Sequence, residues 1–258
     1  MTMFGIFISA LLGLSFGSFL NSLEWRLKQG RSVFKERSIC PSCTSPVRWY
    51  DNIPFFSFII LGRRCRDCKV KLSWQYPLVE LWMGFIFVFI FWFEWRITGI
   101  FSLVILLNWF IVWVLTFIFI YDLKYKEVVD SITLGAAAIV FIFGGFLFWN
   151  EWTSMLIGAI VGAGFFFLQF LVSKGKWVGG GDIRIGMLMG VILGWKLLLV
   201  ALWIAYIIGA ITGVGLLISK KKGMKSEVAF GTFLSLATLI TMLFGENIIG
   251  WYLSLLSF

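Results

Sequence analysis

Charged residues are scarce in this chain: they make up 14% of its 258 residues, and only 13 residues are acidic. In soluble globular domains about a quarter of the residues are charged, so the composition excludes an ordinary soluble fold. Hydrophobic residues account for 60% of the chain and aromatic residues for 19%. We therefore predict an all-α polytopic membrane protein, because backbone groups in lipid must bond internally and a helix achieves this within one segment.

The chain also lacks a linker that would indicate a separate soluble domain. Crossing a bilayer takes about 20 apolar residues as a helix, and the apolar runs predict about eight membrane segments. The run 184–194 is too short to span alone, but glycine recurs in it every four positions, at Gly186, Gly190 and Gly194, which predicts a closely packed helix. The tail 247–258 is compatible with a position along the membrane interface. The expected segments cover residues 3–23, 78–94, 100–121, 132–148, 153–172, 184–194, 196–219 and 228–243.

The 22 basic residues give a net charge of +9, but their distribution argues against a nucleic-acid partner. Eleven of them lie between Trp25 and Tyr76, and further clusters, including the one at 220–225, follow each later pair of spans. Basic residues collect on the cytoplasmic side of membrane proteins. We therefore predict a lipid-embedded protein with its amino terminus outside. No positive charge precedes the run 3–23, so we expect it to be retained and not removed as a signal peptide.

All four cysteines lie in the polar segment 25–76, as the C-x-x-C pairs Cys40–Cys43 and Cys65–Cys68. Each pair offers two sulfur atoms from one tight turn, which suits tetrahedral coordination of Zn²⁺. Two disulfides are the alternative, and a cytoplasmic position disfavours them. We predict a cytoplasmic four-cysteine zinc loop with a structural metal, because four thiolates leave no open position for chemistry.

Two isolated acids, Asp122 and Asp182, stand at the ends of apolar runs. Asp122 follows its run directly, and Asp182 follows Gly179, Gly180 and Gly181, where glycine permits close approach of another chain. Two spans separate the acids, so they emerge on the same membrane face. Side by side, two carboxylates share a proton, and one can act as a base toward water while the other acts as an acid toward a carbonyl. In the alternative, each acid only balances a nearby lysine or arginine, such as Arg184.

Other polar residues lie at the edges of spans. Glu80 is a functional candidate because an unpaired charge within a span is costly, or it pairs with the basic loop. Asn21 and Glu24 are either membrane-boundary anchors or site residues. Asp130 is most simply the start of a helix.

Six motifs follow one another along the chain: Gly17-Ser18-Phe19-Leu20-Asn21, the four cysteines, Tyr76-Pro77-Leu78-Val79-Glu80-Leu81, Tyr121-Asp122-Leu123, Gly179-Gly180-Gly181-Asp182 and Phe230-Gly231. Together these motifs resemble the type IV prepilin peptidases, a family of leader peptidases and N-methyltransferases. The resemblance implies membership of the GxGD group of membrane aspartic proteases, with Asp122 and Asp182 as the catalytic pair.

The resemblance also implies the substrates and the cofactor. The substrates would be type IV prepilins or pseudopilins, with a short basic leader and a glycine before the cut, processed at the cytoplasmic face of the bacterial inner membrane. S-adenosylmethionine would methylate the new amino terminus, with Glu80 and Asn21 in the methyl-donor region. Residues 1–96, including the loop 25–76, would form the methyltransferase-associated part, and residues 97–258 the peptidase domain.

Two functions of other classes stay open from the residues alone. An ion-coupled transporter would use Asp122 and Asp182 in its ion path, although such sites are usually found near the middle of the membrane. A membrane scaffold with a zinc loop would make both acids incidental.

Overall fold

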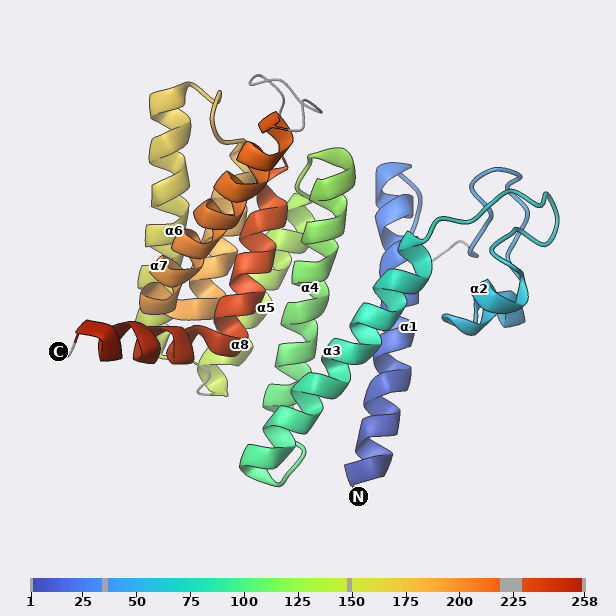
Figure 1. Ribbon diagram of the computed structural model, residues 1–258, viewed down its shortest axis with the longest axis horizontal. Helices are drawn as coiled ribbons and strands as arrows, with labels where there is room; N and C mark the ends of the chain where they lie inside the picture. The colour runs from blue at the N-terminus through green and yellow to red at the C-terminus, as the bar shows by residue number, and fades with distance from the viewer. Residues whose placement is uncertain (1, 34–36, 148–149, 219–228, 257–258) are drawn as a thin grey trace. The chain divides into compact units, whose positions relative to one another are not determined.

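The computed structural model describes residues 2–33, 37–147, 150–218 and 229–256. Within these ranges the chain forms eight α-helices and one 3-10 helix, with two isolated β-bridges and no longer strand (Figure 1), so the predicted all-α class is confirmed. The elements are α1 (Thr2–Lys28), η1 (Trp49–Asn52), α2 (Phe56–Ile60), α3 (Gln75–Thr98), α4 (Leu103–Tyr125), α5 (Asp130–Phe146), α6 (Trp152–Ser173), α7 (Gly180–Ile218) and α8 (Phe230–Leu256).

Among the described residues, six helices are long and apolar enough to cross a membrane: α1, α3, α4, α6, α7 and α8. α5 is a shorter apolar helix that begins at Asp130, as predicted. α7 is interrupted at Gly194, whose φ of 69° is not helical. The predicted short helix 184–194 and the span after it are therefore the two parts of α7. The basic residues 220–225 and the expected start of the last span at Val228 lie outside the described residues.

The chain divides into two compact units, Met1–Trp109 and Phe110–Phe258, so the division falls inside α4. We call them the amino-terminal and carboxy-terminal units. The division expected from the sequence, between residues 96 and 97, falls in the last turn of α3.

In the amino-terminal unit, α1 packs against α3 through glycine. A Cβ atom on Gly13 would lie 2.3 Å from the carbonyl oxygen of Met83, and one on Gly17 would lie 2.7 Å from the Cα atom of Glu80. Side chains at these positions would therefore collide with the α3 backbone. The contact holds the carboxy-terminal half of α1 beside the first turns of α3, where Glu80 lies.

In the carboxy-terminal unit, α6 and α7 meet through two glycine pairs. A Cβ atom on Gly190 would lie 2.0 Å from the carbonyl oxygen of Gly158, and one on Gly162 would lie 2.1 Å from that of Gly186. The four-residue glycine repeat therefore marks close helix packing, as predicted. It fixes the first part of α7, which carries Asp182.

Candidate functional site

Asp122 lies in the last turn of α4 and is 6% exposed. Its Oδ2 atom accepts a hydrogen bond of 2.8 Å from the backbone N–H of Thr232, in the first turn of α8. The first N–H groups of a helix have no partner within the helix, and the positive end of the helix dipole attracts a carboxylate. Asp122 is therefore held in place by the start of α8.

Asp182 lies in the first turn of α7 and is 8% exposed. Its Oδ2 atom accepts a hydrogen bond of 2.9 Å from the N–H of Gly179, just before the helix. This is one half of a capping box, in which a side chain of the first turn bonds back to the residue that precedes the helix. Asp182 is thus also oriented by a helix start.

The three glycines before Asp182 differ in what they do. A Cβ atom on Gly181 would lie 2.5 Å from Cγ2 of Val128, so a side chain there would collide with the loop between α4 and α5. Around Gly180 a Cβ atom would meet nothing within 4 Å. Close approach therefore requires glycine at 181, whereas Gly179 acts through its N–H group.

The two aspartates belong to one site within the carboxy-terminal unit. A Cβ atom on Gly231 would lie 2.9 Å from Oδ2 of Asp122 and 2.8 Å from Cδ1 of Ile185, one turn beyond Asp182. Arg184 does not balance Asp182: its Nη1 atom forms an ion pair of 2.6 Å with Oδ1 of Asp130.

The two C-x-x-C pairs share one backbone conformation. In each, the N–H of the first cysteine, Cys40 or Cys65, donates a bond of 2.9 Å to the carbonyl five residues later. The residue after each second cysteine has a positive φ, 58° at Thr44 and 59° at Lys69. Such repeated tight turns present paired sulfur atoms toward one centre. Equivalent bridged pairs flank both turns: Ile39 with Pro46, and Arg64 with Lys71.

The four sulfur atoms lie within 4.8 Å of one another, so the cysteines could hold a metal ion. The Sγ atoms of Cys40 and Cys68 are 3.9 Å apart. Hydrogen bonding to Ser45 lowers the pKa of Cys43 to about 6, whereas burial raises the pKa of Cys40. A thiolate is therefore available at neutral pH to begin metal binding.

Glu80 and Asn21 line one pocket of the amino-terminal unit. Oε2 of Glu80 accepts a bond of 2.7 Å from the backbone N–H of Phe55, in the cysteine loop. Nδ2 of Asn21 donates to the carbonyl of Tyr76 at 3.2 Å. The structure thus brings both predicted residues to one cavity, where Glu80 bonds to the backbone of the loop.

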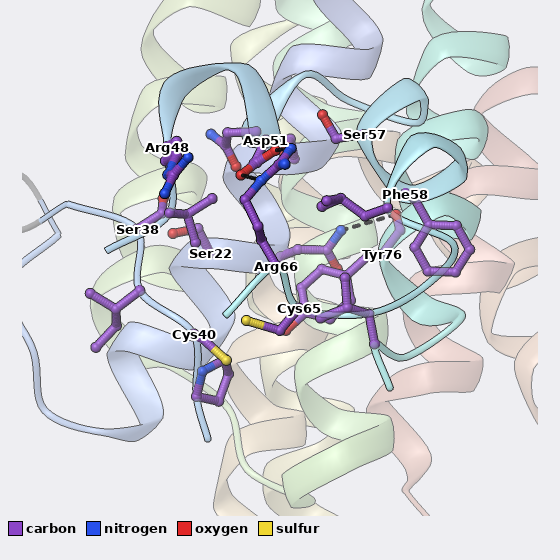
Figure 2. A pocket seen from close by; sticks show the side chains of 18 of the residues that line it. Ser22, Ser38, Cys40, Arg48, Asp51, Ser57, Phe58, Cys65, Arg66 and Tyr76 are labelled. Carbon is purple, nitrogen blue, oxygen red and sulfur yellow. Dashed lines mark hydrogen bonds and ion pairs between the residues drawn. The ribbon is translucent and has the colours of Figure 1, made fainter. Parts of the chain in front are cut away.

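Sequence reasoning missed two polar contacts at this pocket. Nε2 of Gln75 donates to both Glu24 and Asn21, each at 3.2 Å, and so ties α1 to the start of α3. Arg66 donates two bonds, of 2.8 and 2.6 Å, to Asp51, which lowers the pKa of that carboxyl. Figure 2 shows this pair at one end of the pocket, with the sulfur atoms of Cys40 and Cys65 at the other. No sequence spacing links these residues.

The structure describes a helical multi-pass membrane protein with a candidate metal centre and two buried aspartates, each of which accepts a hydrogen bond from an N–H group at the start of a helix. Two family models match the chain: the Bacterial Peptidase A24 N-terminal domain over residues 11–94 and the Type IV leader peptidase family over residues 109–214. The chain belongs to the type IV leader peptidase family. The gap between the two matched ranges ends near the boundary between the two compact units.

Several curated relatives carry the name prepilin leader peptidase/N-methyltransferase. The relative from Aeromonas salmonicida is 30% identical, with 95% of this chain and 92% of the relative covered. The relative from Legionella pneumophila is 31% identical over 86% of this chain and 77% of its own length. The relative from Stutzerimonas stutzeri is 27% identical, with 96% of this chain and 93% of the relative covered. No solved structure matches the chain.

Proposed function

We propose that this protein is a membrane aspartic endopeptidase that removes the short basic leader of type IV prepilins or pseudopilins and then N-methylates the new amino terminus. The observation that carries the peptidase assignment is the single site formed by Asp122 and Asp182, each held by a helix start. Family membership supports the same activity. It favours a peptidase over an ion-coupled transporter or a scaffold.

Asp122 and Asp182 form the catalytic pair. One carboxylate takes a proton from a water molecule, whose oxygen attacks the scissile carbonyl carbon, while the other donates a proton to the carbonyl oxygen. The C–N bond then breaks, and the leaving amine takes up a proton. The two acids titrate as one unit, because two neighbouring carboxylates resist carrying two charges. The starts of α7 and α8 fix one oxygen of each acid.

The pocket of the amino-terminal unit is where S-adenosylmethionine would bind. Its lining combines the carboxylate of Glu80 and the amide of Asn21 with the rings of Trp25 and Tyr76, which suits a ligand with a cationic centre and an aromatic base. When bound, this cofactor supplies the methyl group. Asn21 and Glu80 would hold and orient it, and the loop around Phe55 would cover it.

The cysteine cluster suits a structural Zn²⁺ ion. Four thiolates about 2.3 Å from a tetrahedral zinc lie about 3.8 Å from one another, and the Cys40 and Cys68 sulfur atoms are 3.9 Å apart. Cys40 and Cys65 also line the pocket. Zinc would therefore shape the methyl-donor pocket by joining the two C-x-x-C pairs, Cys40–Cys43 as the first knuckle and Cys65–Cys68 as the second.

The protein would lie in the bacterial inner membrane with its amino terminus outside and both sites facing the cytoplasm. Eleven basic residues between Trp25 and Tyr76 support this orientation. The short basic leader of a prepilin would be cut on that side.

Product masses test the two activities together. Purified protein is incubated with a prepilin, with and without S-adenosylmethionine. We expect the mass of the cleaved pilin in both reactions, and one added methyl group only with the cofactor. An unchanged prepilin, or ion uptake into vesicles that depends on the two acids, would contradict the proposal.

A further inference from the structure

The short helix α2 (Phe56–Ile60) exposes its large apolar side chains. Phe56, Ile59 and Ile60 are 56%, 59% and 77% exposed, and their spacing places them on one face of the helix. Ser57 points the other way and is buried. An exposed apolar face outside the spans indicates an interaction surface.

The segment before α2 lies beside the membrane-spanning part of α1. Asn52 and Pro54 line a cavity that extends along α1 from Ser15 to Arg26. The next residue, Phe55, bonds to Glu80, which packs against Gly17 of α1. Measured along the helix axis, Ser15 lies about 20 Å before Lys28, the last residue of α1, because a helix rises 1.5 Å per residue. Figure 1 likewise shows α2 level with the body of α1 and not beyond its end. Residues 52–60 therefore reach the depth of the apolar span.

The backbone of this segment has the internal partners that such a depth demands. The N–H of Ile53 donates to Oγ of Ser57 at 3.1 Å, and that hydroxyl donates to the carbonyl of Tyr50 at 2.9 Å. The N–H of Phe55 donates to Glu80 of α3 at 2.7 Å. Irregular backbone is tolerated at membrane depth only where protein or a water-filled cavity satisfies it.

The charge pattern fits the same position. Residues 52–62 carry no charge; Arg48 and Asp51, which pairs with Arg66, precede them, and Arg63 and Arg64 follow them. Arginines at both ends of an apolar stretch can reach the phosphate groups of the cytoplasmic leaflet. This pattern favours lipid over a protein partner as the occupant of the apolar face.

We infer that residues 52–60 form a re-entrant segment that inserts into the cytoplasmic leaflet beside α1 and α3, with Phe56, Ile59 and Ile60 in contact with lipid acyl chains. Glu80 then has a positioning role, because its bond to Phe55 holds the segment at that depth. This inference does not depend on either proposed activity.

A photocrosslinker tests the contact directly. p-Benzoylphenylalanine replaces Ile60 in the full-length protein, reconstituted in vesicles of phosphatidylethanolamine and phosphatidylglycerol, and adducts are identified by mass spectrometry. The control places it at Lys69, an exposed residue of the second knuckle. We expect lipid adducts at position 60 and almost none at position 69, because only the probe at position 60 would contact acyl chains. Equal labelling, or adducts mainly to a second copy or to an added prepilin, would overturn the inference.

Hydrogen exchange at the Phe55 amide gives a second test that needs no crosslinker. A charge in the segment, introduced by Ile60→Asp, should displace it and raise exchange at this amide by about tenfold or more, whereas Ile60→Leu should not. Unchanged exchange in Ile60→Asp would contradict insertion. If Ile60→Asp does not insert into the membrane, the crosslinker at Phe56 decides the question by the same criterion.

Discussion

The two units orient their acids in different ways. In the carboxy-terminal unit, Asp122 and Asp182 bond to N–H groups at the starts of α8 and α7, so the geometry of the site follows from helix packing. In the amino-terminal unit, Glu80 bonds to Phe55 in an irregular loop that also contains the cysteine cluster. The peptidase site should therefore depend on helix contacts, and the methyl-donor pocket on the loop and its metal.

The largest effect should come from Asp122→Asn. An amide cannot take or give the proton that hydrolysis requires, so leader removal should fall by roughly 10²- to 10⁴-fold. Cleavage is measured by the mass of the pilin product. The matched control is Asp130→Asn, which removes the ion pair with Arg184 and should leave cleavage near its normal rate. Normal cleavage by Asp122→Asn would show that the acid pair is not catalytic.

Cys40→Ser should act mainly on the other unit. Losing one of four thiolates should release zinc, loosen the loop and lower methylation more than cleavage. Metal content is measured by atomic emission and both activities by product mass. Ser42→Ala, between the two cysteines of the first knuckle, is the control and should keep its metal. A full zinc complement in Cys40→Ser would rule out the four-thiolate site.

Gly190→Ala should weaken the carboxy-terminal unit. The new methyl group would lie 2.0 Å from the Gly158 carbonyl oxygen, so α6 and α7 must separate, at a cost of about 1–3 kcal/mol. Gly164→Ala meets open space in the same unit and should not destabilise it. Thermal unfolding in detergent compares the two variants. Equal stability would mean that α6 and α7 do not pack at this distance.

The smallest effect concerns the metal-free cysteines. With a pKa of about 6, Cys43 is largely thiolate at pH 7, whereas the raised pKa of Cys40 keeps that thiol protonated. Cys43 should therefore react with iodoacetamide several-fold faster than Cys40, and its rate should fall as the pH drops below about 6. Peptide mass spectrometry measures both rates. A faster Cys40 would reverse the assignment.

Much of the carboxy-terminal site could be predicted from the sequence. Chain parity predicts that Asp122 and Asp182 lie on one membrane face, and the glycine repeat predicts the close packing of α7. The hydrogen bond from Thr232 to Asp122 could not be predicted, because it joins residues far apart in the chain. The same holds for the amino-terminal unit, where spacing predicts the cysteine pairs but not the bond from Phe55 to Glu80.

The helix α2 also escaped prediction, and the division of the chain after residue 96 stays a prediction. Hydropathy marks Phe56–Ile60 as apolar but too short to span, and it does not show how deep an irregular loop lies. The boundary between Trp109 and Phe110 falls within one continuous helix, where composition does not change.

The most direct test that cleavage and methylation use separate sites is to incubate the Asp182→Asn variant with S-adenosylmethionine and, in parallel reactions, with intact prepilin or with a pilin whose leader has been removed. We predict that intact prepilin stays uncut, while a pilin whose leader has already been removed is methylated at the normal rate. Normal cleavage of the prepilin, or loss of methylation together with cleavage in a folded protein, would contradict the account.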